Sequence, residues 1–149
     1  MTLLSRCSTW WVVFGIWFIA LQILSSIHGH PGSEQIFPHI DKVMHVGYFA
    51  AGGTALAIAL RLHWEPRFPL WKPLLWTTVI ATGTVVGAFD EWRQSFVAHR
   101  SGNSLADWGA DILGSILACL FLPLCWKLLG IRSMIDAPSR DRDSRGSSI

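Results

Sequence analysis

The stretch LLWTTVIATGTVVGAFDEWRQSF, residues 74–96, decides which fold this chain can adopt. It is long and apolar, yet its last seven residues include Asp90, Glu91, Arg93 and Gln94. Ionisable groups are costly inside hydrocarbon, so within spans they face a bundle interior or a wet cavity and usually mark a functional site. The stretch therefore predicts a membrane-spanning helix with a polar site near one end.

Three further stretches are apolar and close to the ~20 residues that a spanning helix needs, and two of them also carry ionisable residues near the same end. Of the 149 residues, 51% are hydrophobic and 15% are charged, whereas a soluble domain is about one quarter charged. We therefore expect an all-α fold, a four-helix transmembrane bundle. The predicted spans are residues 9–27, 43–61, 74–97 and 105–129. They belong to one integral membrane domain, residues 1–130, and the Ser-, Arg- and Asp-rich tail, 131–149, is expected to be disordered and cytoplasmic.

Local signals place the starts of two of these helices. Pro73, the last of three prolines in the second connector, cannot continue a helix, so the third helix is expected to begin at Leu74. Ser104, followed three residues later by Asp107, is typical of a capping box at the start of the fourth.

Small residues at four-residue spacing would let three of the spans pack closely, as such residues do in membranes. They are Ala51, Ala55, Ala59, Gly83, Gly87, Ala110, Gly114 and Ala118. We interpret them as packing surfaces between helices.

Lysine and arginine are unevenly divided between the two ends of the predicted bundle. Nine of the 12 lie on the side that both termini share with the second connector. Because short cytoplasmic loops carry the excess of Lys and Arg, both termini are expected in the cytoplasm. The ionisable ends of the spans then lie on the extracytoplasmic side.

The ionisable groups of three helices should also lie at a common depth. His45, Asp90 and Asp111 each stand 16–18 residues from a basic residue at the other end of their helix. At 1.5 Å per residue this is about 24–27 Å, within a hydrocarbon core of ~30 Å. The matching heights predict one shared polar pocket.

The candidate site residues come from these three spans. Asp107 and Asp111 are four residues apart and share a helix face, where two carboxylates need a cation, a proton or hydrogen bonds. The candidate catalytic residues are Glu91, His45 and Asp107. The candidate binding residues are Asp41, Lys42, Asp90, Gln94, Arg100 and Asp111. A buried ion-pair network that only fixes helix register is the structural alternative to a functional pocket.

The segments DKVMH (41–45) and DEWRQSF (90–96), with Arg100 and with Asp107 followed by Gly114, resemble the VanZ-like family. That family of small multispanning bacterial proteins has a D-K-x-x-H segment, an E-x-x-Q segment, a nearby arginine and a D-x-x-x-N-x-x-G segment. The resemblance covers roughly half of the chain. It implies a bacterial inner-membrane protein with a cell-envelope role, related to teicoplanin resistance. Asp111 departs from the pattern, which usually has asparagine there, and the additional acid can bind a cation or stay protonated.

Two classes of function fit these residues. In the first, an intramembrane enzyme acts on a lipid-linked or envelope substrate. Glu91 or Asp107 is then the general acid or base and His45 a proton shuttle, since such groups transfer protons when burial tunes them. Lys42 and Arg100 would clamp a phosphate or carboxylate. In the second class, the same groups bind or sequester a head group, an antibiotic or a partner helix without reaction. A transporter is a third option, for which four helices without a discontinuous pair offer little support.

No cofactor and no metal is predicted. A metal site of His45, Glu91, Asp107 and Asp111 is conceivable, but no compact motif such as HExxH supports it. A net charge of +2, without a basic stripe, argues against nucleic acid. The expected partners are membrane lipids or an envelope precursor, and no oligomeric state is predicted.

Overall fold

The computed structural model describes residues 3–26, 40–64, 71–97 and 104–131, which form helices with no strand among them. A short 3-10 helix, η1 (Leu3–Ser5), precedes four long helices. They are α1 (Cys7–Ser26), α2 (Ile40–Trp64), α3 (Trp71–Gln94) and α4 (Leu105–Leu128). The predicted all-α four-helix bundle is confirmed. From residue 132 onward, the tail predicted to be disordered lies outside the described residues.

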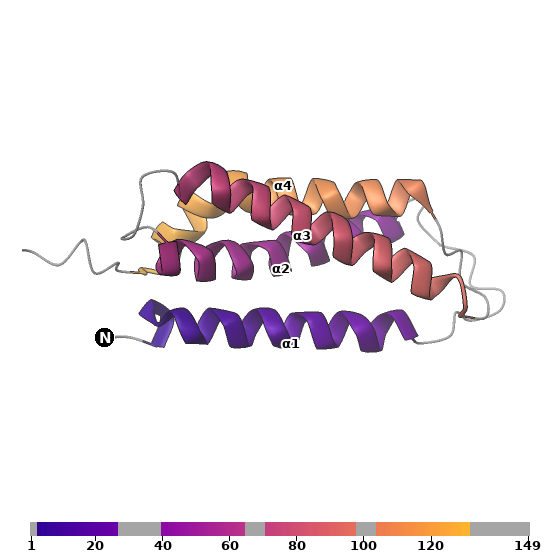
Figure 1. Cartoon of the computed structure of the whole chain (residues 1–149), viewed down its shortest axis with the longest axis horizontal. Helices are drawn as coiled ribbons and strands as arrows, with labels where there is room; N and C mark the ends of the chain where they lie inside the picture. Colours follow the sequence, from indigo (N-terminus) through magenta and orange to yellow (C-terminus); the bar gives the residue numbers. More distant parts are fainter. Residues whose placement is uncertain (1–2, 27–39, 65–70, 98–103, 132–149) are drawn as a thin grey trace, which may run out of the picture.

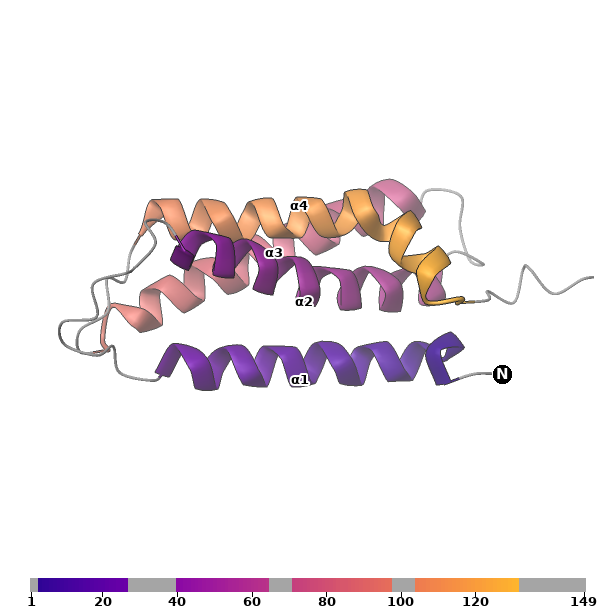
Figure 2. The same ribbon diagram turned by 180° about the vertical axis from the view of Figure 1, so that it is seen from behind.

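Successive helices run in opposite directions, so the start of α1 and the end of α4 lie at the same end of the bundle (Figures 1 and 2). The central helix is α2, which contacts α1, α3 and α4, and α4 most extensively. The start of α2, the end of α3 and the start of α4 therefore come together at the opposite end, on the right in Figure 1.

Two prolines lie inside helices. α3 begins at Trp71 rather than at Leu74, and Pro73 sits in its first turn. The N–H that proline lacks has no intrahelical partner in a first turn, so Pro73 is tolerated there. Pro123 lies inside α4, whose end turns away from the axis of its earlier part (Figure 2). Proline removes one helical hydrogen bond and commonly bends the helix at that point.

Glycines allow the close contact between α2 and α4. A Cβ on Gly114 would meet the backbone of α2 at the carbonyl oxygen of Val46 and, at 2.9 Å, at the nitrogen of Ala50. Such backbone contact is possible only where a side chain is absent, as in other close membrane helix pairs. Gly114 therefore belongs to a packing surface, as predicted, whereas Ala51 of the predicted set is exposed.

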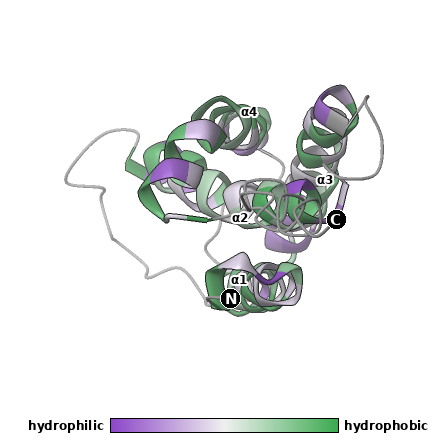
Figure 3. Cartoon of the chain, turned by 90° about the vertical axis from the view of Figure 1, so that its left-hand side faces the viewer, coloured by the Kyte–Doolittle hydropathy of each residue, from purple (hydrophilic) through white to green (hydrophobic). Residues whose placement is uncertain are grey.

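Polar side chains are buried and large apolar ones are exposed at many positions of this bundle. Asp90 and Asp111 are fully buried, while Ile16 and Ile19 of α1 are 62% and 60% exposed. Hydrophobic residues predominate on the helices (green in Figure 3). Exposing such side chains to water would be unfavourable, whereas contact with lipid would not.

Three of the described helices, α1, α2 and α4, are long and apolar enough to cross a membrane. These features fit an integral membrane protein. α3, which was also predicted to span, does not meet the same test of length and composition. Its threonines and its polar last turn lower its hydropathy below that of the other three helices.

Candidate functional site

The candidate site lies at the end of the bundle where α2 and α4 begin and α3 ends. Five buried polar residues of α3 and α4 gather there, and each is less than a tenth exposed. They are Asp90, Glu91, Gln94, Asp107 and Asp111. Burying so many polar groups is costly unless they are paired, so their partners define the site.

Lys42, in the first turn of α2, lies between two carboxylates. Its Nζ is 3.0 Å from Asp41 Oδ2 and 3.0 Å from Asp107 Oδ1 of α4. The Lys42 side chain is 34% exposed, whereas that of Asp107 is 8% exposed. The lysine therefore reaches from the edge of the bundle to a buried acid, and links the starts of α2 and α4.

His45, one turn further along α2, pairs with Asp111. His45 Nδ1 lies 2.8 Å from Asp111 Oδ1. When Asp111 is ionised its carboxylate only accepts hydrogen bonds, so Nδ1 then carries the proton and Nε2 remains available to a ligand. Asp111 fits because α3 has no side chain at Gly87, where a Cβ would lie 2.6 Å from Asp111 Oδ2. The position that departs from the VanZ-like pattern is thus occupied by the partner of His45.

Glu91 holds the start of α4. Glu91 Oε2 accepts a hydrogen bond of 2.7 Å from the backbone N–H of Ser104. Ser104 is the N-cap, and its Oγ accepts from the N–H of Asp107 at 3.2 Å. The predicted cap is confirmed, but Glu91 of α3 binds the Ser104 N–H, in place of the Asp107 side chain that a capping box would use. The Asp107 carboxylate is therefore left to face Lys42.

Asp90 and Gln94 form a neighbouring polar group with α1. Asp90 Oδ2 accepts from Gln94 Nε2 at 2.7 Å, and Asp90 Oδ1 accepts from the Ser25 hydroxyl. Arg93 does not pair with these acids. Its guanidinium donates to the Gln22 carbonyl oxygen at 3.1 Å, and also to the side chains of Gln22 and Ser26.

The contribution of α1 was missed in the sequence. Gln22, Ser25 and Ser26 lie in the last turns of α1 at spacings of three and four residues, after an apolar run from residue 10 to residue 21. That pattern was the signal that could have found them. Their polarity is modest, so the charges of the other three helices obscured it.

A cavity of about 260 Å³ lies beside these groups, between α1, α2 and α3. Its apolar lining includes Leu24 and Met44, which are 48% and 67% exposed. Its polar lining comprises Ser25, Asp41, His45, Asp90 and Gln94, together with Tyr48. The cavity thus extends from the exposed apolar surface to the buried polar groups.

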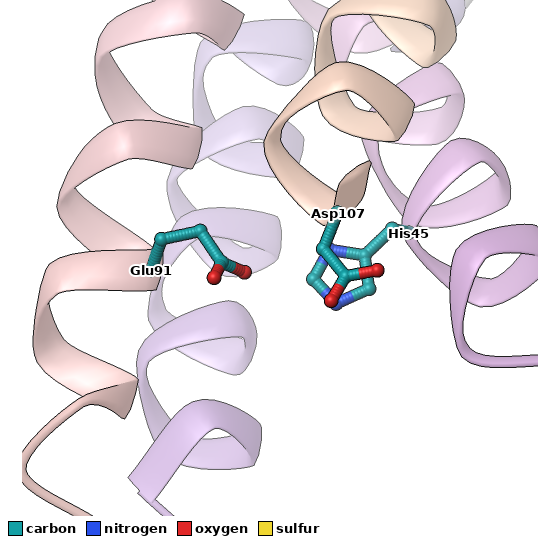
Figure 4. A group of neighbouring side chains, drawn as sticks. All are labelled: His45, Glu91 and Asp107. Carbon is teal, nitrogen blue, oxygen red and sulfur yellow. The ribbon is translucent and has the colours of Figure 1, made fainter. Parts of the chain in front are cut away.

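The structure brings the three candidate catalytic residues together. A ligand atom of each lies within 4.8 Å of those of the other two, and the carboxylates of Glu91 and Asp107 face the ring of His45 (Figure 4). Of the candidate binding residues, Lys42 and Asp111 contact this group directly. The remaining described candidates, Asp41, Asp90 and Gln94, line the cavity. Arg100 lies outside the described residues.

Acidic groups outnumber basic ones in the described part of the site. The two basic groups that pair with its acids are Lys42 and His45. The five carboxylates are Asp41, Asp90, Glu91, Asp107 and Asp111. Ionised carboxylates only accept hydrogen bonds, so this arrangement suits a cation, a proton or a ligand with donor groups. It can also transfer protons, because buried acids beside a histidine are the usual agents of general acid–base catalysis.

Comparison of the chain with models of known protein families, with curated proteins and with solved structures finds no match.

Proposed function

We propose that this chain is a VanZ-like protein of the bacterial cell membrane that binds the polar head of a lipid or lipid-linked envelope compound. The observation that carries the proposal is the lining of the cavity between α1, α2 and α3. Exposed Leu24 and Met44 form one part of it, and buried Asp90 and half-buried His45 form another. An amphipathic ligand matches this lining, since its alkyl chain would contact the apolar part and its head the polar part.

The excess of carboxylates favours a head group that donates hydrogen bonds through hydroxyl or ammonium groups. An anionic head group would have to draw on Lys42, which already pairs with two carboxylates. The other cation expected to clamp an anion, Arg100, lies outside the described residues.

The proposed chemistry is proton transfer to or from the bound head group. Glu91 and Asp107 would act as general acid or base, and His45 would carry protons between them and the cavity that it lines. Glu91 Oε1 is buried and has no hydrogen-bond partner among the described residues. This oxygen is therefore free to accept a proton that His45 passes on from the cavity.

Binding without reaction is the second candidate, and one observation favours it. His45 and Asp107 are each engaged by a residue of the protein, by Asp111 and Lys42 respectively. Groups held in such pairs can recognise a head group without transferring a proton. The resemblance to the VanZ-like family is compatible with either candidate, since it implies an envelope role and no particular mechanism.

The two candidates are separated by one experiment on purified full-length protein in nanodiscs, incubated with bacterial envelope lipid extract. Mass spectrometry identifies the lipids that are retained and any product. In Glu91→Gln the side-chain oxygen can still accept from the Ser104 N–H, while the carboxylate is lost. A product formed by the wild type and abolished in Glu91→Gln supports catalysis. Saturable retention without product, preserved in Glu91→Gln, eliminates the reaction.

The cavity itself is tested by filling it. Met44→Trp places a larger side chain in the cavity wall and should abolish lipid retention. Leu120→Trp is the matched control, because Leu120 is exposed on α4 and does not line this cavity. Equal retention by the two variants would refute binding at this place.

We propose further that both termini are cytoplasmic and the site extracytoplasmic, because nine of the 12 Lys and Arg residues lie on the side of the termini. A C-terminal reporter enzyme that is active only outside the cytoplasm should remain inactive. Activity of this fusion in intact cells would reverse the orientation.

A further inference from the structure

We infer that His45, Glu91 and Asp107 form a binding site for a divalent transition-metal ion, Zn²⁺ or Mn²⁺, held between α2, α3 and α4. The inference goes beyond the head-group proposal, because an ion can bind these side chains whether or not a lipid does. It rests on the geometry of the three side chains, on an unpaired buried oxygen and on the partner of His45.

The geometry supplies three ligands from three helices. One ligand atom each of His45, Glu91 and Asp107 lies within 4.8 Å of the other two (Figure 4). Ligands at ~2.0–2.2 Å from a shared ion lie about 3.3–3.6 Å apart in a tetrahedral shell. Closure by up to about 1.5 Å would therefore bring all three side chains into such a shell.

Glu91 has an oxygen that needs a partner. The residue is only 4% exposed, and its Oε1 has no hydrogen-bond partner among the described residues. Its carboxylate points toward the ring of His45 and the carboxylate of Asp107 (Figure 4). A buried polar atom without a partner is costly, and coordination to a cation would satisfy it.

The partner of His45 is the one that a metal-binding histidine usually has. Histidine ligands generally donate their second ring N–H to a carboxylate or carbonyl, which fixes the tautomer and orients the ring. Asp111 Oδ1 lies 2.8 Å from His45 Nδ1 and so leaves Nε2 for the ion. Asp111, which is fully buried, is therefore a positioning residue.

The ligand set points to the class of ion. One imidazole nitrogen with two carboxylates suits zinc, manganese or iron, whereas calcium takes oxygen ligands only and magnesium usually retains several waters. Three protein ligands leave at least one coordination position open, as in catalytic rather than structural zinc sites. That position would be accessible to a head-group oxygen from the cavity that His45 lines.

Lys42 makes the proposal distinguishable from a purely structural ion-pair network. Its ammonium lies 3.0 Å from Asp107 Oδ1, where it would compete with an ion for the same carboxylate. Asp41, also 3.0 Å away, would retain the displaced lysine. Lys42→Gln should therefore bind metal more tightly than the wild type, by about two- to fivefold, since a partly exposed ion pair contributes little.

The experiment measures metal content and affinity of the full chain in detergent, without envelope lipid. Chelator-treated protein is loaded separately with Zn²⁺, Mn²⁺, Mg²⁺ and Ca²⁺, desalted and assayed by mass spectrometry of the metal. About one Zn²⁺ or Mn²⁺ per chain is expected, with neither Mg²⁺ nor Ca²⁺ retained. The ion that is retained with the higher affinity identifies the metal.

Variants then locate the site. Glu91→Gln and Asp107→Asn should each weaken binding at least 100-fold, and Asp111→Asn about 10- to 100-fold. His63→Gln is the matched control for metal content, because His63 lies at the other end of α2. Thermal unfolding confirms that each variant is folded.

Three results would overturn the inference. They are the absence of retained Zn²⁺ and Mn²⁺ in folded wild-type protein, wild-type affinity in Glu91→Gln and Asp107→Asn, and weaker binding in Lys42→Gln. If the protein retains no metal but still retains lipid, the metal inference fails and the head-group proposal stands. If it retains metal but no lipid, the head-group proposal fails and the metal inference stands.

Discussion

Replacing Gly114 with alanine should push α2 and α4 apart at the level of the site. The added Cβ would lie 2.9 Å from the Ala50 nitrogen and 3.0 Å from Phe49 Cβ, and closer still to the Val46 carbonyl oxygen. Ordinary contacts of a Cβ begin at 3.4 Å. Two of these three atoms are backbone and cannot rotate away, so the helices must separate by at least 0.5 Å, the difference between 3.4 and 2.9 Å.

The separation should lower the free energy of unfolding and lengthen a hydrogen bond of the site. Overpacking of a close-packed core costs ~1–3 kcal/mol. Asp111 lies one turn before Gly114 on α4, and its partner His45 is on α2, so their distance of 2.8 Å would increase to about 3.3 Å. This is beyond the usual hydrogen-bond range of about 2.7–3.2 Å. Gly114→Ala should therefore weaken both the fold and the site.

The assay is unfolding of the purified protein in mixed micelles, compared with Gly109→Ala. Gly109 is exposed on the same helix, and a Cβ there meets nothing within 4 Å. Alanine at that position should be neutral or stabilise by roughly 0.5–1 kcal/mol, as in other helix interiors. Equal unfolding free energies for the two variants would refute the close contact of α2 with α4.

Three further substitutions test the contacts around the site. Gly87→Ala should displace Asp111 from His45, because the Cβ would lie 2.6 Å from Asp111 Oδ2, and the metal affinity should fall about 10- to 100-fold in the same titration. Ser104→Ala should lower the unfolding free energy by ~1 kcal/mol through loss of the N-cap, whereas Ser104→Thr should not. Arg93→Lys should weaken the packing of α1 on the bundle, because a lysine cannot reproduce the guanidinium contacts with Gln22. Amide hydrogen exchange should then become faster in α1 and stay unchanged in α2. An equal increase of the exchange rate in both helices would contradict this role of Arg93.

Charge position and helix length were enough to predict that the acids of three helices meet. His45, Asp90 and Asp111 stand at similar distances from the opposite ends of their helices, and antiparallel helices of similar length bring such positions to one level. The N-cap at Ser104 was predictable for a local reason, since it depends on residues three apart in the chain. The start of α3 was not, because Pro73 is compatible with a first turn as well as with a helix stop.

The pairing of individual groups could not be read from spacing. Asp107 was expected to complete the cap of its own helix, and Glu91 of α3 does so instead. Arg93 follows Asp90 and Glu91 closely in the sequence, yet it contacts α1 through Gln22 and Ser26. Such choices depend on the rotation of each helix about its axis, which side-chain packing determines.

The sequence by itself determined that this chain forms long apolar helices whose ionisable residues collect at one end. That follows from composition and from the cost of charge in hydrocarbon, both of which are local along the chain. Only the tertiary structure decided that Asp111 supports His45, that Lys42 reaches Asp107, and that a cavity opens against α1. The physical reason is that a helix presents different residues on its different faces, and contacts with neighbouring helices determine which face is buried. The contacts of Gly114 with α2 and of Gly87 with Asp111 are examples.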